Sequence, residues 1–123
     1  DAGAQVTKTD QWYGVFIRVE NRTNKGDQKP RTIQSANGFL IEDNTGKQVK
    51  PVTLPADNLY AYRSTAILPG KHTPAPSSTA ATASIGGNLI LFKVPQTMLD
   101  NRPTKLVILP ADGSEQATIT LDI

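Results

Sequence analysis

The 123-residue sequence contains no cysteine, a single histidine and a single methionine. The absence of cysteine excludes disulfide bonds, thiolate catalysis and thiolate metal sites. A catalytic dyad needs a partner base, and a zinc site needs three or more protein ligands, so we expect His72 to be a bystander in a loop. We therefore predict no catalytic residue, no metal and no cofactor. Carboxylates that converge in the fold are the alternative that would make the protein an enzyme.

Long hydrophobic runs and a strong excess of one charge are also missing. No apolar stretch approaches the roughly 20 residues that a membrane-spanning helix needs, and no stretch has the form of a signal peptide. The formal net charge is only +2, with the two signs interspersed, which is too little for a nucleic-acid footprint. The sequence predicts neither a membrane span nor a nucleic-acid partner.

The composition is that of an ordinary globular domain, with 37% hydrophobic and 20% charged residues. We predict a single domain over residues 1–123, a length that can bury a core. The chain opens on Asp1-Ala2-Gly3-Ala4 without an initiator methionine, and we interpret it as a trimmed product, which favours an exported protein.

The longest apolar run is Asn88-Leu89-Ile90-Leu91-Phe92-Lys93-Val94-Pro95, between a Gly-Gly pair and a proline. It predicts a strand with Ile90, Phe92 and Val94 on one face. Because the opposite face is also largely apolar, we expect this strand in the middle of a sheet, covered on nearly both sides.

Residues 12–21 alternate, with Tyr13, Val15, Ile17 and Val19 on one face, which predicts a half-buried strand. Trp12 and Phe16 fall on the outer face, where they either pack under a loop or form an exposed aromatic patch.

Residues 38–52 predict a hairpin whose turn places Gly46 in the left-handed conformation. Pro51 cannot donate to a ladder, so the returning strand should be an edge. Asp43 and its neighbours lack the spacing of a calcium loop. Two more strands are predicted at 105–109 and 117–123, the latter with Ile119, Leu121 and Ile123 facing inward.

Three segments predict little regular structure. Residues 1–11 are either flexible or contribute an edge strand. Residues 72–84, rich in Thr, Pro, Ala and Ser, predict an extended, mobile loop. Residues 97–103 predict a connection with at most one helical turn.

About seven short strands, many turns and no amphipathic helix predict an all-β fold. The interpretation we adopt is an immunoglobulin-like antiparallel β-sandwich of about seven strands. A small closed barrel is the competing architecture.

Two groups of residues could form an interaction surface. Tyr60, Tyr62 and Arg63 are of the types that carry binding energy when exposed, although they are equally ordinary packing residues. The polar loop 21–31 carries Arg22, Lys25, Lys29 and Arg31, which either contact an anionic partner or simply solvate the loop. Asn21-Arg22-Thr23 also matches an N-glycosylation acceptor.

A family resemblance runs through four motifs in order along residues 12–123. They are Val15-Phe16-Ile17-Arg18-Val19-Glu20-Asn21-Arg22-Thr23, Phe39-Leu40-Ile41-Glu42-Asp43-Asn44-Thr45-Gly46-Lys47, Leu68-Pro69-Gly70-Lys71 and Leu89-Ile90-Leu91-Phe92-Lys93-Val94-Pro95. This order resembles bacterial extracytoplasmic domains of unknown function with a telokin-like immunoglobulin fold, which are often lipoproteins or secreted antigens. The long insertion between Lys71 and Ile85 departs from that family. The resemblance implies no catalytic residues.

These observations favour a non-catalytic, extracytoplasmic immunoglobulin-like module that is secreted or anchored at the cell surface, with a lipid anchor upstream of Asp1 as one form of attachment. Its expected partner is an unknown protein or another component of the cell envelope. The alternative is a binder of a small anionic or glycan ligand through surface loops.

Overall fold

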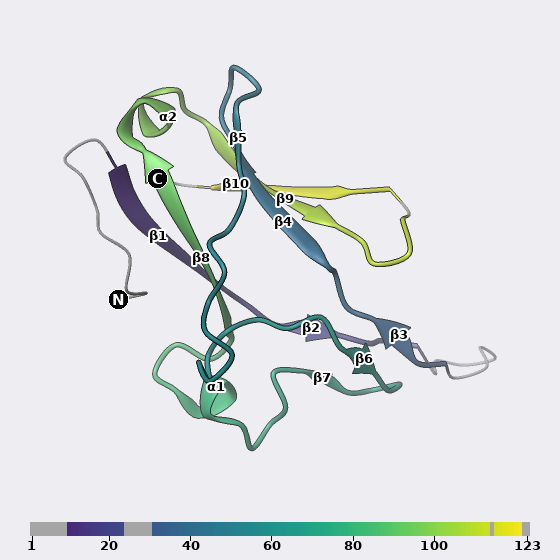
Figure 1. The fold of residues 1–123 in the computed structure, drawn as a ribbon. Coiled ribbons are helices and arrows are strands. Elements are labelled where there is room, and N and C mark those ends of the chain that lie inside the picture. Colours follow the sequence, from purple (N-terminus) through teal and green to yellow (C-terminus); the bar gives the residue numbers. More distant parts are fainter. Residues whose placement is uncertain (1–9, 24–30, 114, 122–123) are drawn as a thin grey trace.

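A computed structural model describes residues 10–23, 31–113 and 115–121 of the chain (Figure 1). The strands in chain order are β1 (Asp10–Ile17), β2 (Val19–Glu20), β3 (Ile33–Gln34), β4 (Gly38–Glu42), β5 (Gln48–Val49), β6 (Ala66–Ile67), β7 (His72–Thr73), β8 (Asn88–Pro95), β9 (Thr104–Leu109) and β10 (Ala117–Leu121). The helices are α1 (Thr79–Thr82) and α2 (Gln96–Asp100). All paired strands are antiparallel, so the prediction of an all-β fold is confirmed.

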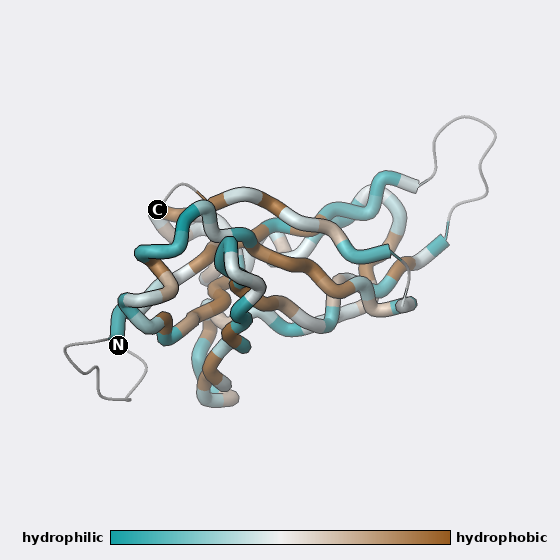
Figure 2. Tube along the Cα trace, turned by 90° about the horizontal axis from the view of Figure 1, so that it is seen from above, coloured by the Kyte–Doolittle hydropathy of each residue, from teal (hydrophilic) through white to brown (hydrophobic). Residues whose placement is uncertain are grey.

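Two layers enclose the core. One sheet has the strand order β10-β9-β4-β5, and β1 pairs with β8 in the facing layer. Short pairs β2–β7 and β3–β6 extend one end of the molecule (Figure 1). Apolar residues are concentrated along the central strands, and polar residues mark the segments that connect them (Figure 2). The sheets are small and do not close on each other.

Strand β8 lies in the middle of its layer, as the sequence predicted. It pairs with β1 on one edge, and on the other edge the Leu91 carbonyl accepts from the Val52 amide at 2.9 Å and the Leu89 carbonyl from the Tyr62 amide at 2.9 Å. The inward residues Ile90, Phe92 and Val94 are buried. Leu89 and Leu91, which face outward, are only half-buried, so the expected cover on that side is incomplete.

The core joins both layers. Phe92 and Val94 of β8 pack with Phe39 and Ile41 of β4, and Met98 of α2 closes one end of the cluster. The inward alternation of β1 is confirmed, because Tyr13, Val15 and Ile17 pack against this cluster. On the outer face Phe16 is 39% exposed and Trp12 is half-buried, which favours the patch over burial under a loop.

The hairpin prediction is confirmed in detail. Strand β5 returns to β4 as the edge of its sheet, and Gly46 has φ 88° in the turn. The prediction that Ile119 faces the core is wrong, because Ile119 is 51% exposed. It lies opposite the buried Leu106, but β10 is the outermost strand of its sheet. Leu121 of the same strand packs against the core, as predicted. Ile123 and residues 1–9 lie outside the described part of the chain.

The stretch 72–84 is not simply extended. His72 and Thr73 form β7 against β2, with His72 opposite Glu20, so His72 lies in a strand and is half-buried. One helical turn follows, capped where the Ser78 hydroxyl accepts from the Ala81 amide at 3.3 Å. The buried Ala80 anchors that turn, and its carbonyl accepts from the Gly87 amide at 3.0 Å.

Candidate interaction surface

A groove of about 440 Å³ opens at the side of the molecule, between the two layers. We call it the lateral groove. Its walls come from β4 and β8, and its rims come from the two segments that cross between the layers, 50–54 and 61–64. The lining residues are Asn37, Gly38, Phe39, Leu40, Lys50, Pro51, Val52, Thr53, Leu54, Ala61, Tyr62, Arg63, Ser64, Leu89, Ile90, Leu91 and Leu109.

The charge of the lateral groove is of one sign. Lys50 and Arg63 are its charged lining residues, and both are exposed. Arg63 is also held in place, because its Nη2 donates to the Pro55 carbonyl at 2.9 Å. A mostly apolar hollow of this size with a few convergent polar groups is typical of a binding site, and two cations at its rim favour a partner that carries carboxylates or other anions.

Tyr62 has a structural role within this groove. Its hydroxyl lies 2.6 Å from Ser35 Oγ and donates a hydrogen bond to the Ala36 carbonyl. Its ring meets Phe39 edge to face, with centroids 5.0 Å apart and planes at 83°. Burial raises the pKa of the Tyr62 phenol above its usual value, and the Ser35 hydrogen bond opposes that shift. Tyr62 therefore forms part of the groove wall and is not a free contact residue.

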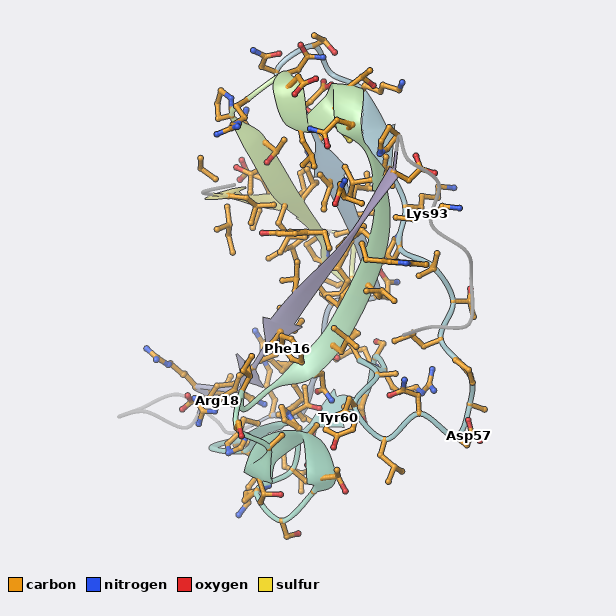
Figure 3. The ribbon with its side chains drawn as sticks, turned by 90° about the vertical axis from the view of Figure 1, so that its left-hand side faces the viewer. Phe16, Arg18, Asp57, Tyr60 and Lys93 are labelled. Atoms are coloured by element: carbon orange, nitrogen blue, oxygen red, sulfur yellow. The ribbon has the colours of Figure 1, made fainter. Side chains whose placement is uncertain are left out.

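Tyr60 is the tyrosine that is available to a partner. It is 40% exposed, next to Leu59, which is 69% exposed. Asn58 fixes the turn before them, since its Oδ1 accepts from the Tyr60 amide at 2.9 Å and the Ala61 amide at 3.1 Å. The Tyr60 carbonyl then accepts from the Leu89 amide at 2.6 Å, which ties this turn to the end of β8 where Phe16 lies (Figure 3).

The structure does not gather the basic residues with the tyrosines. Arg22 is exposed, and its Nε lies 3.9 Å from a carboxylate oxygen of Glu20. Arg31 lines a different cavity, of about 510 Å³, beside Ile33 and Asp112. Lys25 and Lys29 lie outside the described residues. Of the predicted residues that the structure describes, Tyr62 and Arg63 line the lateral groove, and Tyr60 directly precedes the lining residue Ala61 in the chain. Arg22 and Arg31 lie elsewhere.

Asn21, in the glycosylation match, and Asp43, in the stretch compared with a calcium loop, each use their side chains to hold the local backbone in place. Asn21 is fully buried, and its side-chain amide donates to the carbonyls of Arg31 at 3.0 Å and Ile67 at 2.7 Å. This amide is therefore not accessible to glycosylation in the folded protein. Asp43 accepts at Oδ1 from the Thr45 hydroxyl at 2.7 Å and the Thr45 amide at 2.9 Å, within the hairpin turn.

No three His, Asp or Glu side chains in the described part of the chain lie together in a way that could hold a metal ion. No helix formed by the described residues is long and apolar enough to cross a membrane.

Most of the lateral groove could not have been found from the sequence. Its lining comes from five separate stretches of the chain, and only the fold brings β4, β8 and the crossing segments together. Comparison with protein-family models, with curated proteins and with solved structures finds no match for the chain.

Proposed function

We propose that this chain is a non-catalytic, extracytoplasmic module that binds a protein or another component of the cell envelope. The observation that carries the proposal is the lateral groove. It is concave and mostly apolar, with Lys50 and Arg63 at its rim and no acidic residue among the described residues that line it. The exposed pair Leu59 and Tyr60 comes directly before the lining residue Ala61 in the chain and adds exposed side chains, among them a tyrosine, a type on which binding energy concentrates.

The finer architecture belongs to the same proposal. One layer consists of β1, β8 and the segment 60–62 that is bonded to β8, and it packs on the four strands β10, β9, β4 and β5. This arrangement supports an immunoglobulin-like sandwich of about seven strands. Together with the resemblance to telokin-like bacterial domains, it supports an extracytoplasmic location, secreted or anchored to the cell surface.

The experiment compares capture of envelope components by the wild type and by groove variants. Lys50→Glu reverses a charge at the groove rim, and Leu91→Ser removes apolar surface from its wall. Lys71→Glu is the matched control, because Lys71 is exposed and does not line the groove. We expect a component captured by the wild type and by Lys71→Glu to be lost with both groove variants. Capture that is equal for all four proteins would contradict the proposal.

A second candidate is a small anionic or glycan ligand in the same groove, favoured by the two unopposed cations. Titration with an anionic cell-wall glycan, followed by amide NMR shifts, tests it. We expect shifts at Lys50, Arg63 and Leu91 and none at Lys71. If the groove amides do not move while an envelope protein still binds, the ligand is a protein.

A further inference from the structure

Among the residues that the structure describes, strand β1 is bonded along one edge only. Within the described residues it pairs with β8 and with no other segment (Figure 1). The direction of the backbone groups in this layer follows from β8. The Leu89 amide donates to Tyr60, and the Leu91 carbonyl accepts from Val52, so both residues direct their groups away from β1. The even-numbered residues of β8 therefore direct their N–H and C=O groups toward β1, because alternate residues of a strand bond to opposite edges.

The free edge of β1 can now be assigned. The odd-numbered residues of β1 lie opposite the even-numbered residues of β8 and form the hydrogen bonds between the two strands. The even-numbered residues Trp12, Gly14 and Phe16 therefore direct their N–H and C=O groups to the other edge. No backbone hydrogen bond occupies these groups among the described residues.

This edge lacks the usual protection against pairing. Natural edge strands carry charges, prolines or bulges. Residues 11–17 carry no charge and no proline, and the register with β8 continues without a bulge. Gly14 lies in the middle of the strand, and the Leu89 Cδ1 lies 3.1 Å from the position that a Cβ at Gly14 would take, so β8 packs over this residue. β1 is thus a long and unprotected template for another strand.

We infer that the occupant is a second copy of this chain, paired antiparallel along β1 with Gly14 opposite Gly14 of that copy. In this register Trp12 lies opposite Phe16, so an aromatic pair on each side flanks the two glycines. Asp10 lies opposite Arg18, so opposite charges meet at both ends. The even-numbered residues form the hydrogen-bonded pairs, which matches the groups that the free edge presents.

The self-complementarity of β1 about Gly14 is what selects a second copy over an unrelated strand. All of these side chains lie on the outer face of the layer, where Phe16 is 39% exposed. In the single chain, Asp10 Oδ2 lies 3.7 Å from Lys93 Nζ, and Arg18 Nη1 lies 3.3 Å from Glu20 Oε1. Both ion pairs are at the surface, where such contacts contribute little and can exchange partners. Figure 3 shows Arg18 and Lys93 toward opposite ends of the β1–β8 pair.

This inference does not rest on the proposed function. The lateral groove borders the edge of β8 that contacts residues 52 and 60–62, whereas β1 occupies the opposite edge. Leu91 belongs to both surfaces, because it lies opposite Gly14 and lines the groove. Lys50 lines the groove only, whereas Asp10 lies in β1 and Arg18 directly follows it, so Lys50→Glu and the charge reversals at Asp10 and Arg18 test the two surfaces separately.

Sedimentation over a concentration series, with charge reversals, tests the pairing. We expect the wild type to dimerise in the high-micromolar range, as a small interface does. Asp10→Arg and Arg18→Asp each place like charges opposite one another at both ends, and each should raise the dissociation constant about tenfold. An equimolar mixture of the two variants should restore association, because every end pair then has opposite charges.

The controls carry the same charge changes elsewhere. Asp57→Arg and Lys47→Glu alter exposed residues outside β1 and should dimerise like the wild type. Thermal unfolding of each variant checks that it is folded. A wild type that stays monomeric at the highest soluble concentration overturns the inference, and so does a dimer that neither reversal weakens.

Amide hydrogen exchange provides a second measurement on the unmodified protein. Raising the protein concentration should slow exchange at Trp12, Gly14 and Phe16. Exchange at Tyr13 and Val15, whose amides β8 already protects, should not change. Self-association without this alternation would mean that another surface is used, and it would overturn the assignment of β1. Protection that requires a different protein would overturn the choice of occupant.

Discussion

Asn21 and Asp43 occupy the same local pattern, an Asx residue followed two positions later by threonine, and each is buried with its Oδ1 accepting from that threonine. They differ in what surrounds the second side-chain atom. Asn21 Nδ2 faces two carbonyl oxygens, which require a donor. At Asp43 the second atom is Oδ2, which is buried and has no hydrogen-bond partner among the described residues, while Oδ1 accepts a third hydrogen bond, from the Lys47 amide at 3.0 Å. The two positions are therefore not interchangeable.

Asn21→Asp should destabilise the protein by more than about 3 kcal/mol, because it replaces a buried donor with an oxygen aimed at two carbonyls. Urea unfolding measures this loss. Arg22→Ala, at the exposed neighbouring position, should cost less than about 0.5 kcal/mol. If Asn21→Asp and Arg22→Ala unfold at the same denaturant concentration, the amide contacts of Asn21 do not contribute to stability.

The stability of the hairpin turn should depend on acid pH. The hydrogen bond from the Thr45 hydroxyl, supported by the Thr45 and Lys47 amides, lowers the pKa of Asp43 although burial opposes the shift. The folded state therefore binds fewer protons than the unfolded state. This contribution is present above the ordinary Asp pKa of about 3.9 and is lost as pH falls through the folded value. Unfolding midpoints at pH 7, 5 and 3 should fall more steeply for the wild type than for Asp43→Asn. Parallel curves would contradict the assignment.

The element that the sequence defined best is β8. An apolar run with two apolar faces predicted a central strand, and the structure bonds both of its edges. Phe92 is fully buried, so Phe92→Ala should cost about 3–5 kcal/mol through lost transfer energy and an unfilled cavity. Ile119→Ala, at a 51% exposed position of β10, should cost about 1 kcal/mol or less. Chemical denaturation of both variants gives the ranking, and similar losses would show that the core has been misplaced.

Where prediction from the sequence failed, long-range contacts decided the structure. Alternation predicted that Ile119 faces the core but could not show that β10 is the outermost strand and that Ile119 is 51% exposed there. Composition described 72–84 as extended, whereas pairing of His72 with Glu20 and burial of Ala80 give it β7 and α1. The mobility of that segment stays a prediction.

The candidate site, too, could be predicted from the sequence only in part. Tyr60, Tyr62 and Arg63 were predicted from residue type; Tyr62 and Arg63 line the lateral groove, whereas Tyr60 is not among its lining residues. Residue type alone could not show that Tyr62 is engaged in packing. Nor could it show that Lys50 and Arg63 line the same groove, because those residues come from different crossing segments.

For the whole molecule, Tyr62 is the side chain that links the two layers near the groove. It belongs to the segment bonded to β8, yet its ring meets Phe39 of β4, and its hydroxyl bonds the Ala36 carbonyl just before β4. Replacing the hydroxyl with hydrogen leaves that carbonyl and Ser35 with one partner fewer. Tyr62→Phe should therefore cost about 1–3 kcal/mol.

Tyr60→Phe is the matched control, because Tyr60 is 40% exposed and should tolerate the loss of its hydroxyl. The dependence of stability on pH in the alkaline range separates the two variants further. The raised pKa of Tyr62 means that the folded state holds its proton more tightly than the unfolded state. That contribution is present below the ordinary Tyr pKa of about 10 and is lost as pH rises through the folded value. The stability of the wild type and of Tyr60→Phe should thus fall above about pH 10, while Tyr62→Phe should show a shallower decline. If the stability of Tyr62→Phe falls with pH as steeply as that of the wild type, the Tyr62 phenol does not cause the alkaline loss of stability.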